Sequence, residues 1–346
     1  MQNATAASRR PGASELARRE RGLVGKALAS WRTWFLALLL VAAIVFAAFH
    51  WGDVKRFAEL VAHAEPLWLV AALATQLLTY VMLAFEWRVV LKACDCDAPF
   101  LKLLRLTLTK HFADQMVPTA GMSGNVVVVD RLMAIGATRK VAVAAVILTI
   151  ISYYASYAIA AVGVLFLLWL MGEGSWPMIG LIGAFLAVAA GIPTLALWLQ
   201  KKGRRAIPKW LRRVGPIREL FNMIGEAPEG LVRSGTLVAQ LTLLNGIVFA
   251  LDGWTMQLCL FSLGVKAPFA SAFIAFIMAS IVVTLAPIPM GLGSFEAVSI
   301  GTLRLAGISF EAALSATLLF RGFTLWLPLV PGMIAARRDL SRKRKR

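Results

Sequence analysis

Three charged residues stand at isolated positions inside apolar stretches of this sequence. Arg321 and Asp252 each lie deep within an apolar run, and Glu296 follows a Pro- and Gly-rich turn by three residues. Guanidinium groups bind carboxylates and phosphates through paired hydrogen bonds. We therefore expect Arg321 to bind Glu296, Asp252 or the phosphate of a ligand. The alternative role of Glu296 is only to cap the helix that begins at this turn.

A second group of polar residues lies within a short stretch of the chain. Lys110, His111 and Asp114 share a segment in which His111 and Asp114, three residues apart, occupy one face of a helix. One His and one Asp make a poor metal site, because a catalytic zinc normally has three protein ligands. The pattern predicts the polar wall of a cavity, with a role in proton relay, and neither a metal site nor a catalytic centre. Further on, Arg131 is predicted either to contact a phosphate or to pair with Asp130 at a solvated rim.

Hydroxyl groups form a third feature. Residues 152–157 include three of the four tyrosines of the chain. We expect Tyr153 and Tyr157 to line a cavity, and hydrogen bonding between helices is the alternative. Glu86 stands near the end of another apolar run and is expected to form a surface pair with Arg88.

Two turns rich in proline and glycine interrupt moderately apolar regions, residues 99–136 and 268–307. Glycines allow the backbone N–H groups at a helix N-terminus to approach an anion closely, and a lipid phosphate is the natural occupant of such a turn. The turn residues are Pro118, Gly121 and Gly124 in the first region, and Pro287, Pro289, Gly291 and Gly293 in the second.

The amino-acid composition indicates whether water or lipid surrounds the candidate residues. Of the 346 residues, 59% are hydrophobic and only 16% are charged, whereas a typical soluble protein carries about 25% charged residues. Such a chain cannot hide its apolar surface in a soluble globule, so lipid must surround much of it. This excludes a soluble enzyme, a disordered chain and a secreted disulfide scaffold, and it predicts an all-α polytopic membrane protein.

The excess of positive charge predicts the orientation. Residues 1–32, 200–233 and 337–346 carry net charges of +5, +6 and +6 within a total of +18. Six predicted spans place all three segments on the cytoplasmic side, in agreement with the positive-inside rule. We expect a multi-pass protein of the cell inner membrane with cytoplasmic N- and C-termini, whose basic segments contact anionic lipid headgroups and not nucleic acid. The membrane domain is predicted at 33–336, with spans at 34–49, 66–90, 141–171, 176–199, 237–261 and 312–336. The last span is interrupted by Arg321, Pro328 and Pro331.

The two interrupted regions resemble each other. Ala98-Pro99-Phe100 matches Ala267-Pro268-Phe269, and Pro118 and Gly124 match Pro287 and Gly293, all at the same offset in residue number. Each repeat, about 66–171 and about 237–336, thus contains a span, an interrupted hairpin and a span. The repeats start on opposite sides, so we predict an inverted-topology repeat of the kind found in secondary transporters. The hairpins are predicted to be re-entrant; two short spans each, or a repeat that only reflects assembly, are the alternatives.

These motifs resemble a known family. The second turn and the last apolar run are similar to a signature of the lysylphosphatidylglycerol synthase/flippase transmembrane-domain family: Pro287-x-Pro289-x-Gly291-Leu-Gly293-x-x-Glu296, then Arg321-Gly-Phe-Thr-Leu-Trp-Leu-Pro328 and Gly332. The first turn, with Arg131 and Gly136 after it, resembles the other signature. The resemblance covers roughly residues 30–336. Many members have an Arg with an acidic neighbour where residues 147–153 read Ile-Leu-Thr-Ile-Ile-Ser-Tyr, so the first ion pair is missing or supplied elsewhere.

The resemblance implies the flippase-like part of the family, without the soluble aminoacyl-transfer domain that synthases carry. We expect a lipid flippase or transporter that moves a phospholipid or polyprenyl-type lipid between leaflets, with no enzymatic activity and no cofactor. The alternatives are a membrane scaffold for a lipid-synthesis complex and an enzyme acting on a lipid headgroup. The expected partners are membrane lipids, with a second copy of the chain or lipid-synthesis proteins as further candidates.

Overall fold

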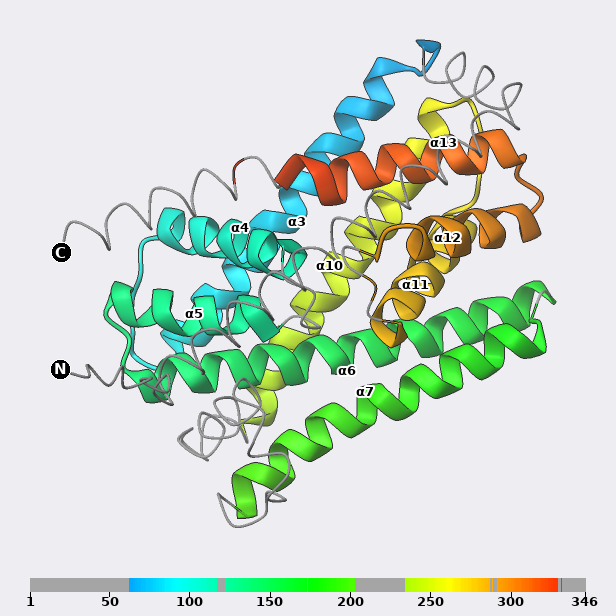
Figure 1. Cartoon of the computed structure of the whole chain (residues 1–346). Helices are drawn as coiled ribbons and strands as arrows, with labels where there is room; N and C mark the ends of the chain where they lie inside the picture. Colours follow the sequence, from blue (N-terminus) through cyan, green and yellow to red (C-terminus); the bar gives the residue numbers. More distant parts are fainter. Residues whose placement is uncertain are drawn as a thin grey trace, which may run out of the picture. The chain divides into compact units, whose positions relative to one another are not determined.

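The computed structural model describes residues 62–116, 122–172, 174–202, 234–286, 288, 291–328 and 331 (Figure 1). Every secondary-structure element in these residues is helical, which confirms the predicted all-α fold class for this part of the chain. In chain order the helices are α3 Pro66–Lys92, α4 Phe100–Met116, α5 Met122–Ile135, α6 Arg139–Met171, α7 Trp176–Lys202, α10 Gly235–Ser262, α11 Phe269–Leu285, α12 Ser294–Leu305, α13 Phe310–Arg321 and the π-helical η4 Gly322–Trp326.

Three of these helices, α3, α6 and α10, are long and apolar enough to cross a membrane. They have 27, 33 and 28 residues, which corresponds to about 40 Å or more of helix against about 30 Å of hydrocarbon. They contain three of the predicted spans. The predicted span 176–199 lies within α7, of which Trp176–Gly191 is a shorter apolar helix. The predicted span 34–49 lies outside the described residues.

The last predicted span, 312–336, is not one regular helix. Helix α13 ends at Arg321, and the π-helical η4 follows it directly. The change of helix type therefore comes directly after Arg321, one of the predicted points of interruption, and the part beyond residue 328 lies outside the described residues except for residue 331. A π-helical turn widens the backbone spiral locally and is frequent at functional sites.

The order of the elements repeats along the chain. Helices α3, α4, α5 and α6 recur as α10, α11, α12 and α13, and α4 and α11 both have 17 residues. The turn that follows α5 is also repeated. Ala137 N donates to Leu132 O, and at the equivalent point of the second repeat Ile308 N donates to Leu303 O. The two helices thus end in the same kind of hydrogen-bonded turn, and the internal repeat itself stays a prediction from the sequence offsets.

The first helices of the two repeats, α3 and α10, pack against each other in opposite directions (Figure 1). Near the start of α3, Glu65 N donates to Ser262 O, at the end of α10, with a distance of 2.8 Å. Nearer the end of α3, Glu86 contacts Asn245, which lies in the first half of α10. Sequence numbers therefore rise along α3 while they fall along α10.

Two apolar clusters form the core, and a polar layer separates them along the three long helices. One cluster contains Ala72 of α3, Tyr157 of α6 and Phe249 of α10; the other contains Ala84, Ile151 and Leu241 of the same helices. Polar residues that are at most 3% exposed lie between these limits. We define them as the buried polar layer: Gln76, Thr79, Ser152, Ser156 and Asn245.

Candidate functional site

The buried polar layer lies near the middle of α3, α6 and α10, the part of a spanning helix that is farthest from water. Polar groups in hydrocarbon are unfavourable unless they are hydrogen-bonded, and in membrane proteins they mark functional sites. Part of the layer is satisfied locally. Thr79 Oγ1 donates to Thr75 O, and Ser152 Oγ donates to Val238 O between α6 and α10. For Ser152 the alternative of hydrogen bonding between helices is therefore confirmed.

The second hairpin turn brings Glu296 and Arg321 together, although they are well separated in the sequence. Helix α12 begins after Gly293, and the Gly293 N–H donates to Glu296 Oε2 at 2.7 Å. Arg321 Nε donates to the other oxygen, Oε1, at 2.8 Å. Glu296 therefore caps its helix and pairs with Arg321 at the same time. The Arg321 side chain is only 10% exposed, and its guanidinium lies 5.1 Å from the centre of the Phe295 ring.

The first hairpin has a similar arrangement with different residues. Asp114 Oδ2 accepts from Lys110 Nζ at 2.7 Å, and Asp114 Oδ1 accepts from Gly124 N at 3.0 Å. Because Gly124 lies against this carboxylate, a Cβ atom at that position would overlap with it. The pairing of Lys110 with Asp114 follows from their spacing of four residues in helix α4. This segment therefore contains an ion pair, where the sequence predicted an open cavity wall.

The two turns have the same pattern of hydrogen bonds. Gly124 and Gly293 stand at equivalent positions of the two repeats. Each donates its N–H to a carboxylate that also binds a cationic side chain, Lys110 in one case and Arg321 in the other. We call these two groups the capped turns. Ile150 stands at the position that matches Arg321 in the sequence offset, and the ion pair of the first capped turn lies within α4.

Asp252 lies on α10 and faces α3. Gln76 and Thr79 of α3 are within hydrogen-bonding reach of its carboxylate. The described carboxylate partner of Arg321 is Glu296 and not Asp252. Of the two carboxylate partners expected for Arg321, the structure thus selects the one on the hairpin turn.

Glu86 corrects one prediction from the sequence. Its side chain is buried, with 5% of the residue exposed. Its Oε1 accepts from Asn245 Nδ2 at 2.7 Å across the α3–α10 interface. The expected surface pair with Arg88 is therefore wrong, because Glu86 lies on the face of α3 that packs on α10.

The tyrosines of α6 divide between two environments. Tyr153 is 40% exposed and lies within electrostatic reach of Asp252 and Asp114. Tyr157 is fully buried, and its ring packs on Phe185 and Phe249. Tyr157 therefore packs within the apolar core, and its place on a cavity wall stays a prediction.

Sequence reasoning missed the role of Tyr80. Its ring packs edge-on against His111, with ring centres 5.5 Å apart. Its hydroxyl donates to Thr324 O of η4 at 3.4 Å. Tyr80 thus connects the polar segment of α4 to the π-helical turn after Arg321. No signal in the sequence near Tyr80 pointed to this link, since both partners belong to other helices.

Gln76 and Asn245 were also missed, and here a signal existed. They are amide side chains inside apolar spans, and they are separated by the same offset in residue number as Gly124 and Gly293. The remaining predicted site residues are less informative. Arg131 is half-buried on α5 beside the exposed Asp130. Gly291 and Gly293 adopt positive φ angles of 61° and 83°, as expected for tight turns. Pro118, Gly121, Pro287 and Pro289 lie outside the described residues.

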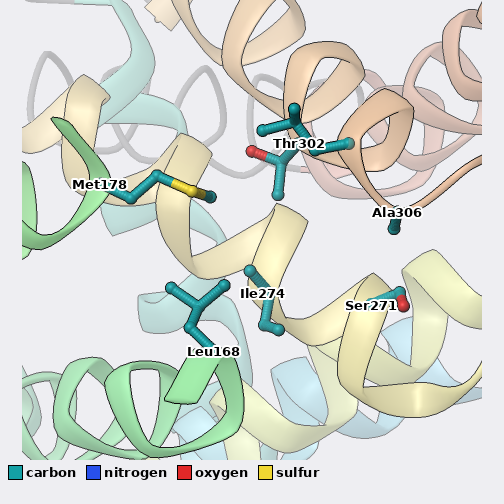
Figure 2. A pocket seen from close by; sticks show the side chains of 7 residues that line it. Leu168, Met178, Ser271, Ile274, Thr302 and Ala306 are labelled. Atoms are coloured by element: carbon teal, nitrogen blue, oxygen red, sulfur yellow. The ribbon is translucent and has the colours of Figure 1, made fainter. Parts of the chain in front are cut away.

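A pocket lies away from this site, where α6, α7, α11 and α12 meet (Figure 2). Its lining is mostly apolar and contains none of the predicted substrate-binding residues: Leu168, Met178, Ser271, Ile274, Thr302, Leu305 and Ala306. In the capped turns, by contrast, the charged side chains are bound to each other in ion pairs. Among the described residues, no three or more His, Cys, Asp or Glu side chains gather as a metal site would require.

Comparison with known proteins shows the family of this chain. A UPF0104 membrane protein of Pyrococcus horikoshii is 20% identical over 319 residues, covering 87% of this chain and 95% of that protein. A UPF0104 membrane protein of Methanothermobacter thermautotrophicus is 22% identical over 334 residues, covering 88% and 93%. The family model described as the lysylphosphatidylglycerol synthase TM region matches residues 34–332, which include both capped turns. The chain therefore belongs to the lysylphosphatidylglycerol synthase transmembrane-region family of membrane proteins.

Proposed function

We propose that this protein is a flippase or transporter that moves a phospholipid or polyprenyl-type lipid between the leaflets of the inner membrane. The observation that carries the proposal is the buried polar layer, which lies at the middle of the spanning helices and is built by both repeats. A scaffold needs no polar groups at this depth. A lipid headgroup that crosses the bilayer does, because its phosphate must exchange water for other polar partners.

The proposed architecture is an inverted-topology repeat with two re-entrant hairpins. The opposite directions of α3 and α10 support the inversion, because these helices begin equivalent repeats. The lengths of α5 and α12, 14 and 12 residues, support re-entry. They correspond to about 21 Å and 18 Å of helix, which is too short to cross about 30 Å of hydrocarbon. In such folds the substrate site lies where the interrupted helices of the two repeats meet.

The capped turns are the proposed phosphate contacts. In each capped turn a carboxylate accepts a hydrogen bond from a backbone N–H and pairs with a cationic side chain. Backbone N–H groups and cationic side chains are also the donors that bind phosphate in proteins. A headgroup phosphate would replace the carboxylate of Glu296 at Arg321, or that of Asp114 at Lys110. The closed ion pair is then the resting state of each turn, and the lipid opens it.

Purified protein in liposomes tests this function. The assay follows a headgroup-labelled phospholipid and measures the fraction that an external quencher reaches over time. We expect wild-type protein to accelerate exchange, and Arg321→Ala and Glu296→Ala to reduce the accelerated rate at least tenfold. Arg304→Gln is the matched control, because Arg304 is an exposed cation at the end of the same short helix, α12.

The result separates the functions considered from the sequence. Exchange at the rate of protein-free liposomes under every ion gradient would refute transport. Equal rates for wild type, Arg321→Ala and Glu296→Ala would refute the role of the capped turn. The orientation is tested separately: both termini are expected to react with membrane-impermeant labels only from the cytoplasmic side.

A further inference from the structure

The α3–α10 interface contains two pairs of a carboxylate and a carboxamide. In one pair Asn245 of α10 faces Glu86 of α3; in the other, Gln76 of α3 faces Asp252 of α10. The two amide residues occupy equivalent positions of the repeats. In each pair, the carboxamide of one predicted repeat therefore faces the carboxylate of the other.

The two pairs differ in how their oxygens are satisfied. In the first pair, Asn245 Nδ2 donates to Glu86 Oε1 at 2.7 Å and also to Leu241 O at 2.9 Å. In the second pair, Asp252 Oδ1 and Gln76 Oε1 are both buried and have no hydrogen-bond partner among the described residues. Gln76 is only 3% exposed, and Asp252 is partly buried. Gln76 and Thr79 lie within reach of the Asp252 carboxylate, but its Oδ1 and the Gln76 Oε1 are two acceptors that one shared hydrogen would satisfy together.

We propose that Asp252 and Gln76 bind a proton, and that this proton is the coupling ion of the lipid transport proposed above. Protonation forms an O–H bond on the Asp252 carboxyl, which then donates toward the Gln76 carboxamide oxygen. The proton comes from water on one side of the membrane and returns to water on the other side. Binding neutralises Asp252, and release restores its charge within the polar layer.

The surroundings favour a proton over a metal ion. The hydroxyl of Tyr80 donates to Thr324 O, and that of Thr79 donates to Thr75 O. The backbone carbonyls of α3 and α10 are engaged in their helices. A hard metal cation needs several oxygen ligands at once, whereas one proton satisfies the carboxyl and the amide oxygen together.

The ionisable groups around Asp252 come from the helices that pack on α10. Tyr80 of α3 and Tyr153 of α6 lie within electrostatic reach of it. Helix α11 has no charged residue. Helix α13 contributes Glu311 in its first turn and Arg321, which is paired with Glu296. Asp252 is the acidic residue of α10. Protonation would therefore change the charge of this helix at Asp252.

Infrared difference spectroscopy of the full chain in lipid tests the proton site without any transport. A protonated carboxylic acid has a C=O stretch that an ionised carboxylate lacks. We expect this band at neutral pH in wild type, its loss in Asp252→Asn, and its retention in Glu86→Gln, the matched change in the other pair. Gln76→Met should shift the band to higher frequency, because the acid loses its hydrogen-bond acceptor. A spectrum unchanged by Asp252→Asn, or a band lost in Glu86→Gln instead, would overturn the proposal.

Transport in liposomes tests the coupling. An imposed pH gradient should change the wild-type exchange rate severalfold and leave the rate of Asp252→Asn unchanged. A dependence on a sodium gradient and not on pH would overturn the proton assignment. If wild type moves no lipid while the infrared band behaves as expected, the proton site stands and the coupling role falls together with transport.

Discussion

Replacing Gly124 by alanine tests whether the first capped turn stabilises the fold. A Cβ atom at this position would overlap with the Asp114 carboxylate, so the carboxylate must leave the Gly124 N–H. A hydrogen bond to a charged group contributes about 1.5 to 3 kcal/mol. We therefore expect Gly124→Ala to lower the free energy of unfolding by about this amount, even though alanine is the better helix former by up to about 1 kcal/mol.

The measurement is equilibrium unfolding of the purified protein in detergent micelles titrated with SDS, followed by tryptophan fluorescence. Gly301→Ala is the control, because a Cβ there meets no atom within 4 Å on the equivalent helix α12. This control should be neutral or slightly stabilising. It also reports the general effect of alanine in a short hairpin helix.

A double-mutant cycle isolates the proposed contact. In an Asp114→Ala background the carboxylate is gone, so adding Gly124→Ala should no longer destabilise the protein. The coupling between the two changes should be about 2 kcal/mol or more. An equal loss of stability from Gly124→Ala in both backgrounds would refute the reasoning, since the loss would then not depend on Asp114.

Two further predictions use the same titration. Asn245→Ala removes the donor to Glu86 and should cost about 1 to 3 kcal/mol, whereas Gln240→Ala, which is exposed on the same helix, should change stability by less than about 0.5 kcal/mol; equal effects would contradict the buried pair. Gly291→Ala combines a φ of 61° with a Cβ that would lie 2.8 Å from Val283 Cγ2 and should cost about 1 to 2 kcal/mol for the backbone alone. Adding Val283→Ala should relieve only the steric part of that cost, and complete recovery would show that the backbone is not strained.

The sequence was sufficient to predict the class of the protein and its long spans. Composition required lipid as the solvent, and run length located α3, α6 and α10 to within a few residues. The constant offset between matching residues predicts which helices are equivalent, and this repeat stays a prediction. The family resemblance could be recognised from the motifs at the second hairpin turn, which are local in sequence, and the family model that matches residues 34–332 shows the membership.

The hairpin partners could be predicted only in part. Glu296 and Gly293 are three residues apart, so a helix cap was foreseeable, and Arg321 was among the expected partners. The first ion pair was not foreseen. Asp114 pairs with Lys110 in its own helix, but its contact with Gly124 needs the chain to reverse between α4 and α5.

The orientation of side chains around the long helices was decided by tertiary structure alone. Glu86 was expected at the surface and is buried, whereas Tyr157 was expected in a cavity and fills the core. The reason is that spanning helices are apolar on every side, because they face either lipid or other helices. Hydrophobic periodicity then contains no information about which face is buried. Only the packing of α3 and α6 against α10 determines which polar groups meet in the buried polar layer.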